Sequence, residues 1–96
     1  MKIEFHADAL KELEQAAAYY EFRVPGLGFD LSEEIDVALD RIGTDPEIGS
    51  VFEQPYRRVA LNRFPFSIVY RIAGDTIRIV AIAHQRRLPG YWKHRK

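Results

Sequence analysis

Apolar residues in the first half of the chain recur at the spacing expected of helices. One stripe follows Asp8, with its members three or four residues apart, and comprises Leu10, Leu13, Ala17, Tyr20 and Val24. This spacing is typical of one face of an amphipathic helix, which Pro25 and Gly26 then end. A second stripe, ended by Gly43 and Pro46, comprises Leu31, Ile35, Ala38 or Leu39, and Ile42. Because the link between the two stripes is short, we expect an antiparallel helical hairpin.

The second half of the chain has the composition of strands. Residues 57–62, 65–72 and 76–84 are rich in β-branched and aromatic side chains, and residues 1–5 alternate weakly. Residues 44–55 are predicted to form a loop. The sequence therefore predicts an α+β fold in a single domain over residues 1–96. In this fold an N-terminal helical hairpin packs on a small antiparallel β-sheet, in the order β-α-α-β-β-β.

Gly74 and Asp75 make a favourable two-residue hairpin turn, which predicts the register of the last two strands. The facing pairs would be Ile72 with Ile77, Arg71 with Arg78, Val69 with Val80, and Ser67 with Ile82. The sheet face that packs against the helices would carry Phe66, Ile68, Tyr70, Ile72, Ile77, Ile79, Ala81 and Ala83. The other face would be mixed and basic, and would carry Ser67, Val69, Arg71, Arg78, Val80, Ile82 and His84.

Charge is segregated between the two halves of the chain, although the net charge is zero. Residues 1–54 contain four Lys or Arg against thirteen Asp or Glu, and residues 55–96 contain ten against one. The balances are therefore −9 and +9. Such a distribution suggests a basic functional surface carried by the second half. The alternative is that the two halves pair with each other through surface salt bridges, which contribute little to stability.

Arg71 and Arg78 would face each other on the basic side of the sheet, where like charges repel. A bound anion would resolve this repulsion, whether a nucleic-acid phosphate or a carboxylate of a partner, because guanidinium groups bind both bidentately. Alternatively, both side chains reach into solvent, or an acidic residue of the C-terminal segment pairs with them. The pair is thus a candidate contact to a partner or a nucleic acid.

Basic and aromatic residues alternate in the C-terminal segment, residues 86–96. This composition can hold phosphates and stack on bases, so Arg86 and Arg87 are further candidate contacts. Alternatively, Tyr91 and Trp92 fold back onto the core as a hydrophobic lid, which is the interpretation we favour for Trp92.

Several chemistries find no support in the composition. The chain has no cysteine, which rules out a disulfide or a thiolate nucleophile and suits the reducing cytoplasm. Its first residues lack a signal-peptide pattern, and its longest aliphatic run, Ile79 to Ala83, is far shorter than the ~20 residues of a membrane span. The three histidines are scattered, and no phosphate-binding glycine loop is present. We therefore expect a cytoplasmic protein with no metal, no cofactor and no membrane contact.

An ordered set of segments resembles the RelE/ParE superfamily of bacterial toxins. The matching segments are Tyr19-Tyr20, Pro25 to Phe29, Pro46 to Gly49, Phe64 to Arg71, Asp75 to Ile79, and His84 to Trp92. The resemblance covers essentially the whole chain. It implies the toxin of a type II toxin–antitoxin, or plasmid stabilisation, module, whose partner is a protein antitoxin encoded beside it.

The resemblance implies two possible targets. ParE-like members inhibit DNA gyrase without catalysis of their own. RelE-like members are metal-free, ribosome-dependent mRNA endoribonucleases, in which the 2′-OH of the substrate attacks the adjacent phosphate and basic side chains stabilise the transition state. A third interpretation, from the basic second half alone, is a non-toxic RNA-binding adaptor.

Matched position by position, the chain keeps only part of the nuclease set. Arg58 and Arg87 stand where RelE-like toxins have basic residues, and Tyr91 lies near the position of the terminal catalytic tyrosine. Ala60 and Ser67 stand where two further cations are expected. His84, with Arg71 and Arg78, could supply a relocated site. The two lost cations favour a ParE-like gyrase inhibitor, with the nuclease as the alternative.

Overall fold

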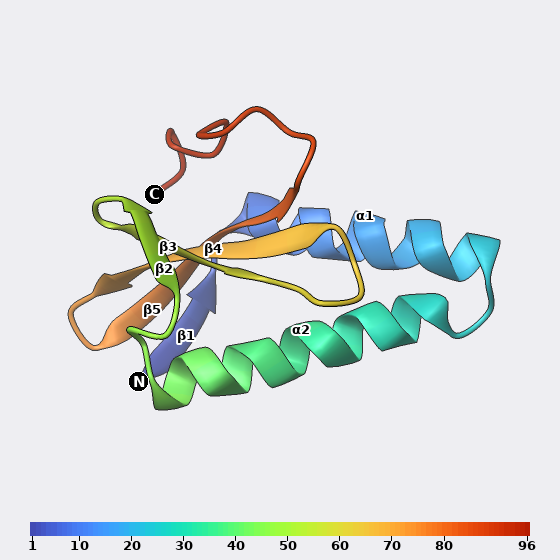
Figure 1. Ribbon diagram of the computed structural model, residues 1–96, viewed down its shortest axis with the longest axis horizontal. Helices are drawn as coiled ribbons and strands as arrows, with labels where there is room; N and C mark the ends of the chain where they lie inside the picture. The colour runs from blue at the N-terminus through green and yellow to red at the C-terminus, as the bar shows by residue number, and fades with distance from the viewer.

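Two helices cover one face of a five-stranded sheet, and the C-terminal segment covers part of the other face (Figure 1). The computed structural model describes residues 1–96. In chain order its elements are β1 (Lys2–Phe5), α1 (Ala7–Arg23), α2 (Leu27–Thr44), β2 (Ser50–Glu53), β3 (Tyr56–Ala60), β4 (Phe66–Ala73) and β5 (Thr76–His84). The predicted α+β class and the order of its elements are confirmed. Neither helix has the length and apolar composition that a membrane span requires.

The helical hairpin is closed by a side chain of its own first helix. The Glu21 carboxylate near the end of α1 accepts hydrogen bonds from the N–H groups of Gly26 (2.7 Å) and Gly28 (3.0 Å). These donors lie at the start of α2, where N–H groups have no partner within the helix. Gly26 adopts a φ of 91°, which glycine reaches without strain, so the connection can be short. The predicted antiparallel arrangement of the two helices is confirmed (Figure 1).

The buried stripe was predicted well for α2 and less well for α1. Leu31, Ile35, Ala38 and Ile42 are all buried in the core. In α1 the buried residues are Ala9 and Ala16, whereas Leu10 and Val24 of the predicted stripe are 43% and 52% exposed. Small residues allow α1 to approach its neighbours closely, and this packing outweighs the hydrophobicity of the two larger side chains.

The sheet is mixed rather than antiparallel throughout. Its strand order is β1-β5-β4-β3-β2, and β1 runs parallel to β5 whereas the other pairs are antiparallel. The sequence predicted four strands and a loop over residues 44–55, and the structure adds β2 within that loop. Three of the four β2 residues are exposed at this edge of the sheet, so the strand lacks the apolar alternation by which strands are found.

A β-bulge between β4 and β5 changes the predicted register. Arg71 faces Arg78 and Ile72 faces Ile77, as predicted, but beyond the bulge Val69 faces Ala81 and Ser67 faces Ala83. The predicted pairs Val69–Val80 and Ser67–Ile82 are therefore wrong. Because a bulge sets two residues of one strand against one of the other, it moves the following side chains to the opposite face. Ile82 consequently packs in the helix-covered core, while Val80, Ala81 and Ala83 lie on the other face.

The second face of the sheet has a small core of its own. Val69, Val80 and Ala81 pack there against Trp92, which is only 2% exposed. The indole lies edge-on to the rings of Tyr56 and Phe52, with centroid distances of 4.5 and 5.7 Å. The prediction that Trp92 packs onto the core is confirmed. By covering this face, the C-terminal segment forms one wall of the cavity described next.

Candidate functional site

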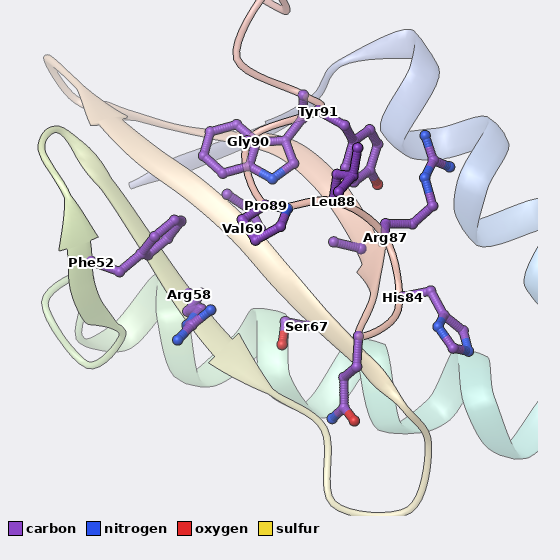
Figure 2. A pocket seen from close by; sticks show the side chains of 13 residues that line it. Phe52, Arg58, Ser67, Val69, His84, Arg87, Leu88, Pro89, Gly90 and Tyr91 are labelled. Atoms are coloured by element: carbon purple, nitrogen blue, oxygen red, sulfur yellow. The ribbon is translucent and has the colours of Figure 1, made fainter.

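A cavity of about 170 Å³ lies between the C-terminal segment and the face of the sheet opposite the helices (Figure 2). Strand β3 contributes Arg58, β4 contributes Ser67, the end of β5 contributes His84, and the C-terminal segment contributes Arg87 and Tyr91. The four side chains that the nuclease interpretation names (Arg58, His84, Arg87 and Tyr91) thus line one cavity. Their roles in any reaction remain a prediction.

The two arginines of the cavity carry charge that no acidic side chain neutralises. The Arg58 guanidinium lies 4.9 Å from the centre of the Phe52 ring, and that of Arg87 lies 3.8 Å from the centre of the Tyr91 ring. Neither belongs to any of the ion pairs of the structure. Stacking on a ring fixes the plane of a guanidinium while its N–H groups stay free for an anion. The cavity is therefore suited to a phosphate or a carboxylate.

His84 stands at the rim of the cavity, beside α1. Its Nδ1 atom accepts a hydrogen bond from the N–H of Arg86 at 3.0 Å, and its ring lies edge-on to Phe66, with centroids 5.1 Å apart. Because Nδ1 acts as the acceptor, the neutral ring is assigned its proton on Nε2. In that form His84 can donate to an anion but cannot accept a proton from a substrate hydroxyl.

Tyr91 faces the cavity with its ring, while its hydroxyl group is used inside the fold. The hydroxyl donates to Oε2 of Glu12 at 2.6 Å, and the same carboxylate pairs with both terminal nitrogens of Arg95, at 2.8 and 3.0 Å. Burial, followed by the hydrogen bond to Glu12, raises the pKa of Tyr91 above its ordinary value. Both effects oppose proton transfer by this hydroxyl near neutral pH.

The floor of the cavity is uncharged where the superfamily resemblance expects cations. Ser67 lines the cavity, and Ala60, on β3, is its partner in the sheet register. Neither can stabilise a pentavalent phosphate. No cluster of three or more His, Asp or Glu side chains is placed to hold a metal ion.

The other candidate contacts lie away from the cavity. Arg71 and Arg78 face each other near the β4–β5 turn, as predicted. The Arg78 guanidinium donates to the main-chain oxygens of Lys96 (2.9 Å) and Phe5 (3.4 Å), so main-chain atoms rather than an acidic side chain accommodate this charge. Arg86 is exposed and does not line the cavity.

The Glu12–Arg95 ion pair was not predicted from the sequence. The two residues are 83 positions apart, in a helix and in the C-terminal segment. The periodicity of α1 does place Glu12 beside its apolar stripe, next to Leu13, but nothing in the sequence indicates which cation it would meet.

Comparison with known proteins shows which family within the superfamily this chain belongs to. A family model described as the ParE toxin of the type II toxin–antitoxin system parDE matches residues 3–89. The chain belongs to the ParE toxin family. A solved structure described as a chromosomal ParDE toxin–antitoxin system from P. aeruginosa superposes with a TM-score of 0.76. The match covers 88% of this chain and 95% of that chain at 20% identity, which shows a shared fold. A search of curated proteins gave no match.

Proposed function

We propose that this ParE-family toxin arrests bacterial growth by binding DNA gyrase, without catalysis of its own, and that a protein antitoxin neutralises it. The match to the ParE toxin model over residues 3–89 carries the proposal. The antitoxin would be encoded in the reading frame beside that of the toxin. Loss of such a pair from a dividing cell would leave the toxin unopposed, which would give the module its role in plasmid stabilisation.

The geometry of the cavity supports an inhibitor rather than an enzyme. Ribonucleolytic attack by a 2′-OH needs a group that removes its proton and several cations on the phosphate. Here the Tyr91 hydroxyl donates a hydrogen bond to Glu12, and Nδ1 of His84 accepts one from the N–H of Arg86. Ala60 and Ser67 supply no charge. Arg58 and Arg87 are left to bind an anion that they cannot cleave by themselves.

One observation favours the nuclease as a second candidate function. Arg58, His84 and Arg87 come from distant parts of the chain and converge on one cavity. In that function the two arginines would hold the scissile phosphate, and the Nε2–H of His84 would donate a further hydrogen bond to it. The Arg58→Ala and Arg87→Ala variants should then each abolish cleavage while the fold remains intact, since both side chains are exposed.

Induced expression in a bacterial host separates the two functions. Transcript integrity and plasmid supercoiling would be followed in the same culture, with purified gyrase tested in parallel. The gyrase proposal predicts altered supercoiling and growth arrest with intact transcripts. Cut transcripts that become intact in the Arg58→Ala and Arg87→Ala variants would establish the nuclease instead.

Neutralisation is tested by adding the adjacent reading frame on a second plasmid. We expect its expression to restore growth. Normal growth of cells that contain a high level of soluble toxin, with no antitoxin, would contradict toxicity and would favour a non-toxic RNA-binding adaptor.

A further inference from the structure

The helical hairpin has an outer surface that no other element covers. Both helices pack on the sheet from one side, and the closed end of the hairpin extends beyond the strands (Figure 1). Phe22 of α1, with Phe29 and Val37 of α2, lies on the side of its helix turned away from the buried residues. The exposed fractions of these three residues are 93%, 67% and 56%. Exposed aromatic side chains on one surface are typical of a contact between proteins.

Three carboxylates share this surface with the apolar side chains. Glu33, Asp36 and Asp40 are exposed, and their spacing of three and then four residues sets them on the same side of α2 as Phe29. None of the three belongs to an ion pair. We name this surface the outer hairpin face. It comprises Phe22, Phe29, Glu33, Asp36, Val37 and Asp40.

The fold makes use of two other acids of α2 and leaves these three without partners. Asp30 pairs with Arg63 at 3.4 Å, and Glu34 accepts hydrogen bonds from the N–H groups of Asn62 (2.6 Å) and Arg63 (3.4 Å). The carboxylates of the outer hairpin face lie three or four positions apart, where like charges repel each other and destabilise a helix. The stability of the hairpin therefore does not account for them, whereas a cationic partner would relieve their repulsion.

The charge of the outer hairpin face selects the class of partner. A nucleic acid or an acidic peptide would be repelled by the face, and a basic protein surface would be attracted to it. Neighbouring carboxylates stand about 5–6 Å apart, in a line about 10 Å long. Such a line of negative charge is complementary to a surface that binds the phosphate backbone of DNA. Gyrase has to present a surface of this kind, because it acts on DNA.

We propose that the outer hairpin face docks on the basic surface with which gyrase holds DNA. Phe22 and Phe29 would be the apolar anchors, and the carboxylates would take the place of phosphates. This inference rests on the proposed function, since it assumes that gyrase is the target. The toxin would keep DNA from part of its binding surface, which is inhibition without catalysis. The cavity with Arg58 and Arg87 takes no part, because it lies on the face of the sheet opposite the helices (Figure 2).

The experiment measures the Kd of the purified toxin for the intact gyrase holoenzyme, with and without a duplex oligonucleotide. Phe29→Ser should raise Kd about tenfold or more, because it removes an aromatic anchor. Asp36→Asn should raise Kd about threefold or more at low salt and less at high salt. The duplex should compete with the wild-type toxin. Glu47→Gln is the matched control for charge and should leave Kd unchanged, since Glu47 is exposed and unpaired but lies in the loop after α2.

The inference is overturned if the duplex does not compete, or if Phe29→Ser and Asp36→Asn bind gyrase as tightly as Glu47→Gln does. Phe29→Ser that keeps gyrase binding and loses antitoxin binding would assign the face to the antitoxin. A wild-type dimer that becomes monomeric in Phe29→Ser would assign it to a second copy of the chain. Binding of the wild-type toxin with no effect of the variants contradicts this inference alone, whereas no binding of the wild type contradicts the proposed gyrase target as well.

Discussion

At the scale of single residues, Glu12 joins α1 to β5 and to the C-terminal segment. Its carboxylate accepts hydrogen bonds from the Ile82 N–H, the Tyr91 hydroxyl and both terminal nitrogens of Arg95. The side chains of Glu12 and Arg95 are only 15% and 8% exposed. The two-pronged geometry and the extra donors satisfy the Glu12 carboxylate and the two terminal nitrogens of Arg95, charges that would otherwise be costly to bury.

Replacing Glu12 should therefore destabilise the fold severely. In Glu12→Ala the buried Arg95 loses its two-pronged partner and keeps only the Val80 carbonyl oxygen and the more distant carboxylate of Asp8, at 3.9 Å. We expect the free energy of unfolding to fall by about 3–5 kcal/mol. Urea unfolding followed by Trp92 fluorescence would measure the change. Glu14→Ala, an exposed acid on the same helix, is the control and should change stability by less than about 0.5 kcal/mol. An equal fall in the free energy of unfolding in the two variants would show that the buried Glu12–Arg95 pair stabilises the fold no more than an exposed acid does.

Alkaline titration of Tyr91 tests the same network of hydrogen bonds to Glu12. Burial and the bond to Glu12 raise the pKa of Tyr91, and burial raises that of Tyr70. Because the fold favours the neutral phenol, this stabilisation is fully present below the unfolded pKa of about 10 and is lost as the pH rises beyond it. Absorbance of tyrosinate should show a late-titrating component, reduced in Tyr91→Phe. An unchanged titration curve in that variant would contradict this assignment.

At the scale of elements, large apolar side chains were better guides than small ones. The stripe of α2 consists mainly of Leu and Ile and was predicted correctly. The buried face of α1 is set by Ala9 and Ala16, whose weak hydrophobicity gives little signal. The bulge at Val80 gave no signal in the alternation of residues along the strand, so the register beyond it was predicted wrongly.

The residues of the candidate site were predicted through the family resemblance and not from the physical properties of the sequence. Arg58 and Arg87 were chosen by position in the superfamily pattern and His84 as part of a relocated site, and the structure brings all three to one cavity. Their distance along the chain gives no indication that they meet. Tyr91 was matched near the position of the catalytic tyrosine, and its hydroxyl donates a hydrogen bond to Glu12, a contact that depends on tertiary packing.

The two glycines within α2 should respond to alanine in opposite directions. A Cβ on Gly28 would collide with the main-chain oxygen of Ala17 in α1, which cannot move aside, whereas a Cβ on Gly43 would lie an ordinary 3.6 Å from Ile3. Gly28→Ala should therefore lower the free energy of unfolding by about 1–3 kcal/mol. Gly43→Ala should raise it by up to about 1 kcal/mol, since alanine favours helix. Thermal unfolding of both variants measures this, and a shift of the same sign would contradict the packing of the hairpin.

At the scale of the whole molecule, the two oppositely charged halves neutralise each other only in part. Four of the five ion pairs join an acid of residues 1–54 to a cation of residues 55–96. These pairs use only Arg63, Lys93 and Arg95, so seven of the ten Lys and Arg residues of the second half remain without a carboxylate partner. The surplus is consistent with a surface that meets an anionic partner.

Salt should therefore affect association much more than folding. Exposed ion pairs contribute about 0–1 kcal/mol each, and the buried Glu12–Arg95 pair is screened weakly. Raising the salt from about 0.05 to 0.5 M, which shortens the screening length to a few ångströms, should change the free energy of unfolding by less than about 1 kcal/mol. The association rate with the antitoxin should fall by about tenfold or more over the same range, because unpaired cations steer an acidic partner. Urea unfolding and stopped-flow binding at matched salt concentrations measure the two quantities. A loss of several kcal/mol of stability with an unchanged association rate would mean that the segregated charges serve to hold the halves together, and not to attract a partner.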